Sequence, residues 1–155
     1  MKRQKRTVGA FVKIDLENGF YSIARILENA NYAFYDILLP KDEKDYDLND
    51  ISKKPILFIL AVYDHAITKG RWSKKGKLPL EENLQILPNK FIQDEFNLAK
   101  FELYNSDTGE ISPASRIECL GLECAAVWEP EHVESRIQDY YNGEPNVWVE
   151  QLKIK

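Results

Sequence analysis

Residues 8–40 read VGAFVKIDLENGFYSIARILENANYAFYDILLP, and this stretch decides the fold of the chain. It contains three runs rich in β-branched and aromatic residues, the types enriched in strands: residues 8–16, 20–27 and 32–39. Residues 17–19 and 29–31 separate the runs and supply the Asn and Gly that tight turns favour. The sequence therefore predicts three strands joined by short turns into an antiparallel meander.

Further strands are predicted downstream of the meander. Residues 56–62 form an uninterrupted apolar run after Pro55, the pattern of a strand buried on both faces. Residues 101–104 and 110–112 flank the polar segment 105–109, NSDTG, which is a strong hairpin signal. These strands extend the β-rich character of the chain well past its N-terminal third.

One helix is clearly predicted in the C-terminal part. Pro130 suits the first helical position and Gly143 suits the stop. Between them, apolar residues recur on one helical face: Val133, Ile137, Tyr140 and Tyr141. A shorter helical turn is predicted at residues 64–69. A buried strand is predicted at residues 125–128, and a C-terminal tail strand is predicted at residues 143–155.

Two connections and the overall class complete the expected architecture. Residues 41–50 predict a solvated loop with one helical turn near its end, and residues 70–88 a long, functional or flexible connection. The length of 155 residues suits one domain, residues 1–155. The predicted class is α+β, mostly antiparallel β as a twisted sheet or partly open barrel, with one C-terminal helix and short helical turns.

The net charge, the N-terminal residues and the length of the apolar runs limit the possible classes of function. A net charge of −4 argues against broad electrostatic binding of DNA, which needs a dense positive surface. The charged residues 1–6 are not followed by a signal-peptide apolar run, because Lys13 and Asp15 interrupt it. No stretch approaches the roughly 20 apolar residues of a membrane span. A cytoplasmic location without membrane contact is therefore expected.

The residues that commonly carry catalysis or bind metals form no complete motif. Asp64-His65 and His132 provide the only histidines, and no local pattern places a nucleophile beside them. A small hydrolase using Asp64 and His65 is the weakest of the three functional alternatives. Cys119 and Cys124 lack a second pair of zinc ligands, so we expect them to be buried thiols. No metal, cofactor or catalytic residue is predicted.

A basic segment supports a second functional alternative. Residues 69–77 carry five cations around Trp72 and no acid, a combination that can hold single-stranded nucleic acid by charge and stacking. This alternative is an RNA- or small-ligand-binding β-rich module centred on that segment. The acidic chain as a whole makes nucleic acid an unlikely partner. The ordinary interpretation is a solvated loop whose tryptophan packs into the core.

An acidic segment supports a protein-binding function. Residues 41–50 could attract a cationic partner and raise its association rate. The candidate contact residues are five acids and one aromatic anchor, with two outlying acids: Asp42, Glu43, Asp45, Tyr46, Asp47 and Asp50, with Glu81 and Glu82.

Ordered short motifs resemble the immunity protein 26 family of bacterial polymorphic toxin systems over about residues 5–140. The motifs are GAF at 9–11, ARI at 24–26, FYD at 34–36, PILF at 55–58, DHAI at 64–67, GRW at 70–72, Gly76, PL at 79–80, FIQD at 91–94, TGE at 108–110, ECLGLE at 118–123 and AAVWEPEHVE at 125–134. The chain departs from the pattern at Ala10, where an acid is expected, and at Glu129, a poorer N-cap than Asp.

The resemblance implies a non-enzymatic protein made beside a toxin. Such a protein binds the cognate toxin domain, encoded nearby, and occludes its active or target-binding surface. The resemblance brings no catalytic residues with it. The primary hypothesis is therefore tight, stoichiometric inhibition of a toxin by a cytoplasmic immunity protein.

Overall fold

The N-terminal meander forms the centre of the larger of two sheets. The computed structural model describes residues 3–155, so residues 1 and 2 of the charged start lie outside the described residues. Strands β1 (Ala10–Asp15), β2 (Phe20–Ile26) and β3 (Asn31–Tyr35) pair antiparallel in sequence order. The predicted meander is confirmed.

The turn between β2 and β3 fixes the register of this pair. Asn29 and Ala30 have φ angles of 51° and 64°, and the N–H of Asn31 donates to the carbonyl of Glu28 at 3.0 Å. Two consecutive central residues with positive φ are typical of a type I′ turn, whose twist matches that of paired strands. Residues 29–31 of this turn also line a cleft between the two sheets.

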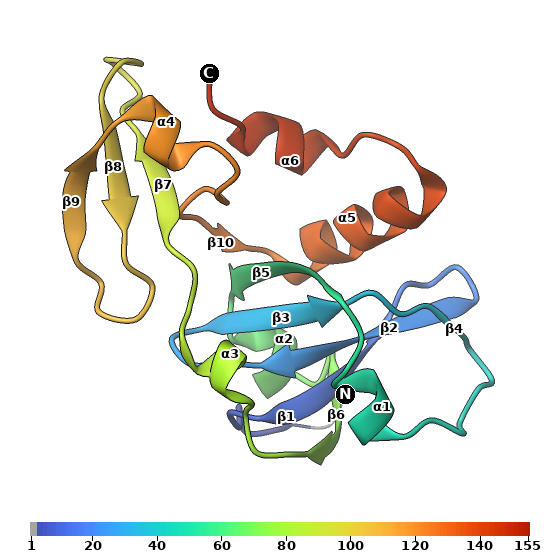
Figure 1. The fold of residues 1–155 in the computed structure, drawn as a ribbon. Coiled ribbons are helices and arrows are strands. Elements are labelled where there is room, and N and C mark those ends of the chain that lie inside the picture. The colour runs from blue at the N-terminus through green and yellow to red at the C-terminus, as the bar shows by residue number, and fades with distance from the viewer. Residues whose placement is uncertain (1–2) are drawn as a thin grey trace.

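Segments from later in the chain complete the main sheet (Figure 1). β5 (Ile56–Val62) pairs antiparallel with β3, β6 (Ser73–Lys77) pairs antiparallel with β1, and β10 (Val127–Trp128) pairs parallel with β5. β4 (Leu39–Pro40) pairs with β2. The strand order is therefore β10-β5-β3-β2-β1-β6, with β4 beside this path.

A second, three-stranded sheet lies beside the first. It consists of β7 (Lys90–Gln93), β8 (Phe101–Tyr104) and β9 (Ile111–Ala114), all antiparallel, and it confirms the hairpin predicted around residues 105–109. A parallel bridge between Phe91 and Cys124 connects this sheet to the segment before β10. Neither sheet closes into a barrel, so the class is α+β with two open, mostly antiparallel sheets.

Helices cover both faces of the main sheet. On one face, α2 (His65–Thr68), α5 (Pro130–Asn142) and α6 (Val147–Leu152) pack over a core that includes Val12, Phe34, Trp72, Val133 and Ile137. On the other face, α1 (Leu48–Ile51) and α3 (Glu82–Gln85) contribute Ile51 and Leu84. A short helix, α4 (Arg116–Cys119), contributes Cys119 to the core of the small sheet.

Helix α5 has the bounds that its sequence signals predict. Pro130 stands at its start, and Gly143 ends it in the left-handed conformation with φ of 66°. Val133 and Ile137 are fully buried, whereas Tyr140 is half exposed. The helical turns predicted near residues 50 and 64–69 are also present, as α1 and α2.

The prediction of a strand in the tail, residues 143–155, is wrong, because this region contains helix α6. Asn146 caps that helix: its side-chain oxygen accepts hydrogen bonds from the N–H groups of Trp148 and Val149, both at 3.1 Å. Trp148, Val149 and Leu152 then pack against the main core. Their spacing places them on one helical face, which the alternating apolar pattern of the segment concealed.

The prediction of a long loop over residues 70–88 is also wrong, since β6 and α3 lie within it. β6 reads SKKGK and is an edge strand paired only with β1. Lysines on an edge strand deter pairing with other chains, so a strand of this kind lacks the alternating apolar pattern. The strand predicted at 125–128 is present but is limited to the two residues of β10.

Candidate functional site

Five acids of the predicted contact set lie on the connection between β4 and α1 (Figure 1) or, in the case of Asp50, in the first turn of α1. Asp42, Asp45, Asp47 and Asp50 are exposed, and Glu43 is half-buried. Within residues 3–155, no salt bridge involves any of these five acids. We call residues 42–50 the acidic segment.

Two acids of the acidic segment also shape its backbone. A carboxylate oxygen of Glu43 accepts the N–H of Asp45 at 2.8 Å, and a carboxylate oxygen of Asp47 accepts the N–H of Asn49 at 2.8 Å. Asp47 is thereby the N-cap of α1. These hydrogen bonds hold the acids on a defined backbone, which limits the ordering that binding would require.

Tyr46 connects the acidic segment to the core beneath it. Its half-buried ring packs edge-on against Tyr21, with ring centroids 6.4 Å apart. The Tyr21 hydroxyl in turn donates to the carbonyl of Glu43 at 2.6 Å. Burial, followed by the proximity of Tyr46 and Glu43, raises the pKa of Tyr21, which keeps this hydroxyl protonated. Tyr46 is therefore a fixed aromatic with one accessible side.

The two outlying acids, Glu81 and Glu82, have different surroundings. Glu81 pairs with the fully buried Arg25 at 3.2 Å. The Arg25 guanidinium also donates to the carbonyls of Gly9, Leu78 and Pro79, at 2.6, 2.7 and 2.9 Å. Glu82 is exposed in the first turn of α3. Glu81 thus compensates a buried cation, and Glu82 is the more accessible of the two.

Asp64 and His65, the residues of the hydrolase alternative, pair with other side chains and not with each other. His65 Nε2 lies 3.2 Å from a carboxylate oxygen of Glu129, whereas Asp64 lies 3.7 Å from Arg6. His132 stacks on Trp148 with ring centroids 3.5 Å apart and lines a groove of about 300 Å³ with Tyr63. No serine, threonine or cysteine is among the described residues that line this groove. The groove beside His132 therefore offers no hydroxyl or thiol nucleophile from these residues.

The RNA-binding alternative required an accessible Trp72, and this requirement is not met. Trp72 is fully buried, and its indole N–H donates to Glu134 at 2.9 Å. Arg71 makes two further bonds to the same carboxylate, at 2.8 and 2.7 Å, and this pairing raises the Arg71 pKa. A base cannot stack on a buried ring. The remaining lysines of residues 69–77 mostly belong to the edge strand β6.

The two cysteines are free thiols. Cys119 is buried and Cys124 is half-buried. Burial raises the pKa of both thiols, which lowers their reactivity at neutral pH. Among residues 3–155, no group of three or more His, Cys, Asp or Glu residues is arranged to bind a metal ion.

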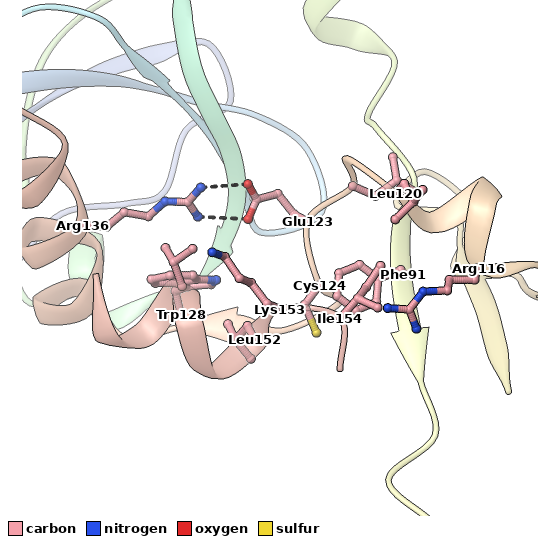
Figure 2. A pocket seen from close by; sticks show the side chains of 12 residues that line it. Phe91, Arg116, Leu120, Glu123, Cys124, Trp128, Arg136, Leu152, Lys153 and Ile154 are labelled. Atoms are coloured by element: carbon pink, nitrogen blue, oxygen red, sulfur yellow. Dashed lines mark hydrogen bonds and ion pairs between the residues drawn. The ribbon is translucent and has the colours of Figure 1, made fainter. Parts of the chain in front are cut away.

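A cavity of about 320 Å³ lies where α5, α6 and the small sheet meet (Figure 2). Arg136 and Glu123 form a two-bond ion pair across it, at 2.9 and 2.8 Å. The Arg136 guanidinium also lies 4.0 Å from the centroid of the Phe58 ring. The Arg136–Glu123 pair connects α5 to the segment before β10, and Arg116 and Lys153 are the other charged residues that line the cavity.

One known protein family matches this chain. The sequence model of one family, described as immunity protein 26, matches residues 7–102, more than half of the chain. The chain belongs to the immunity protein 26 family. Searches of curated proteins and of solved structures each find no match.

The immunity protein 26 match covers the acidic segment and both outlying acids, and it ends within β8. The resemblance from residue 103 to 140 lies outside the match and stays a prediction. Within residues 3–155, no helix has the length and apolar character needed to cross a membrane.

Sequence reasoning missed one surface feature of this immunity protein 26 member. A cleft of about 420 Å³ lies between the two sheets, and the buried Lys90 is among its lining residues. Local sequence carried no signal for this cleft, because its walls come from segments that are far apart in the chain.

Proposed function

We propose that this chain is a non-enzymatic immunity protein that binds a cognate bacterial toxin and occludes its active or target-binding surface. The observation that carries the proposal is the immunity protein 26 match over residues 7–102. The toxin is encoded nearby as part of a polymorphic toxin system used in bacterial competition, and the two proteins meet in the cytoplasm.

The acidic segment is the proposed contact surface for a cationic part of the toxin. Its four exposed aspartates supply a local negative field, which accelerates association with a basic partner. Tyr46 adds an aromatic ring whose position is already fixed by Tyr21, and fixed aromatics are typical of binding hot spots. Glu82, exposed on α3, is the proposed outlying contact.

Co-expression tests the proposed function. The toxin is the C-terminal domain encoded immediately upstream, and it is induced in cells with or without this chain. We expect survival only when the chain is present, with both proteins co-purifying in equal amounts. Arg25→Ala, which should prevent folding, serves as the negative control. Death of cells that contain the folded chain at equal or higher levels would overturn the proposal.

A further inference from the structure

The cleft between the two sheets has walls that are largely apolar. The small sheet contributes Ile92, Tyr104 and Ile111, the main sheet contributes Ala61 and Val127, and residues 125–126 lie just before β10. Ile111 and Val127 are 55% and 48% exposed. A concave, mainly apolar surface with a few polar groups is typical of a binding site.

Lys90 places a cation within this apolar cleft. It lies opposite Tyr104 in the register of β7 and β8, and only 3% of it is exposed. Its ammonium donates to the side-chain oxygen of Asn31 at 2.8 Å. An ammonium has three N–H donors, and residues 3–155 provide Lys90 with this one side-chain hydrogen bond.

No carboxylate of the described residues pairs with Lys90. Glu123 is the acid that acts on it electrostatically, but both oxygens of Glu123 are bonded to Arg136. Burial is the main influence on Lys90 and lowers its pKa. A buried charge without a partner is unfavourable, so an incoming carboxylate would gain an interaction that the free protein lacks.

Hydrogen bonds hold the cleft in shape before any partner arrives. The Asn31 amide donates to the carbonyl of Asn29 at 2.8 Å, which turns its oxygen toward Lys90. The Asn29 amide donates to the carbonyls of Ser106 and Asp107, at 2.9 and 3.1 Å, and so connects the two sheets. A preformed site loses less conformational freedom on binding.

We propose that this cleft receives an aspartate or glutamate side chain of the cognate toxin. The carboxylate of that side chain pairs with Lys90, and apolar toxin residues next to it pack on Ile111 and Val127. The proposal rests on the proposed function and deepens it. Asn31, the first residue of β3, lines the cleft, whereas the connection from β4 to α1 lies toward the other end of that strand (Figure 1), so the two surfaces can be tested separately.

The test compares the toxin affinity of the full chain with that of Lys90→Met, which is unbranched like lysine, is one atom shorter and carries no charge. We expect the Kd to rise at least about thirtyfold, since a hydrogen-bonded charge pair would be lost. Lys100→Met, an exposed lysine beyond the far end of β7 and β8, is the matched control and should bind like the wild type. An unchanged Kd for a folded Lys90→Met protein would overturn the proposal.

A double-mutant cycle identifies the partner acid. Each Asp or Glu of the toxin is replaced by its amide, and one replacement should weaken binding to the wild type but not to Lys90→Met. Lack of coupling to every acid would contradict the proposal. So would millimolar binding of acetate that leaves toxin affinity unchanged, or a concentration-dependent dimer that Lys90→Met abolishes.

A second variant covers the case in which Lys90→Met does not fold. Ile111→Glu places a like charge beside the incoming carboxylate at an exposed position, and Ile111→Gln is its uncharged control. We expect Ile111→Glu to bind at least about tenfold more weakly than Ile111→Gln. Equal affinities of the two variants would exclude the cleft as a contact site and leave the proposed function standing. A wild-type protein that binds no toxin would overturn both the proposed function and the cleft proposal.

Discussion

Arg25 shows how a single charged side chain organises several segments of this molecule. It has no exposed surface, and its guanidinium bonds three carbonyls and the Glu81 carboxylate. It also lies 4.2 Å from the centroid of the Phe11 ring. Arg25 thereby fixes β2 to the segment that precedes α3. Removing one member of a buried pair leaves an uncompensated charge, so Glu81 contributes to stability whether or not it contacts a toxin.

Neutralising Glu81 and neutralising its neighbour Glu82 should therefore have different effects on the stability of the protein. Glu81→Gln should lower the free energy of unfolding by about 1–2 kcal/mol, a value reduced because Glu81 is partly exposed. Glu82→Gln, at an exposed site, should change it by less than about 0.5 kcal/mol. Urea denaturation measures both. Equal stability of the two variants would show that Glu81 does not compensate Arg25.

At the scale of elements, helix α6 depends on its N-cap residue, Asn146. Asn146 accepts two backbone N–H bonds at the start of α6, and its amide donates to Asp139 of α5 at 2.8 Å. It therefore caps one helix and joins it to the other. α6 in turn supplies Trp148, Val149 and Leu152 to the main core.

Asn146→Ala should destabilise the protein by about 1–2 kcal/mol, because a helix cap and a bond between helices are lost together. Asn142→Ala, an exposed residue at the end of α5, is the matched control. Thermal unfolding followed by circular dichroism measures the difference. Identical melting temperatures for the two variants would show that α6 is held by its apolar contacts alone.

Elements with strong local signals were predictable, and those that depend on distant partners were not. The meander and α5 carry their own turns, caps and apolar periodicity, so their positions follow from sequence. β6 exists because β1 accepts it, and its lysine-rich sequence gives no strand pattern. α6 was mistaken for a strand because its apolar residues also alternate.

The candidate site also has features that were predictable from local sequence and features that were not. The exposure of the acidic segment follows from its composition and was predicted. The pairing of Glu81 with Arg25, and the position of Lys90 beside Asn31 without a carboxylate partner among residues 3–155, depend on contacts between residues more than 50 positions apart in the chain. Composition and spacing contain no information about such contacts.

At the scale of the whole molecule, charge is distributed unevenly over the surface. The acidic segment carries five acids, and the edge strand β6 carries Lys74, Lys75 and Lys77; the two adjoin where Leu48 of α1 packs over Gly76. A partner with a basic surface would therefore approach one region preferentially. Such steering acts on the rate of association and weakens as salt screens it.

Neutralising the acidic segment should slow toxin association. Its five acids, Asp42, Glu43, Asp45, Asp47 and Asp50, are replaced by their amides, which keep the shape of each side chain and the cap at Asp47. We expect association to slow roughly tenfold at low salt and its salt dependence to flatten. Amides at the exposed Glu95, Glu110 and Glu144 are the control. An unchanged association rate, measured by stopped-flow fluorescence, would remove the acidic segment from the interface.

The central claim is that this protein neutralises a toxin by occupying its surface and not by turnover. Titrating the purified chain against a fixed amount of the active toxin domain tests this claim most directly. Toxin activity should fall linearly and reach zero at one equivalent, without dependence on incubation time. Complete inactivation by a small fraction of an equivalent, progressing with time, would show catalysis and contradict the account.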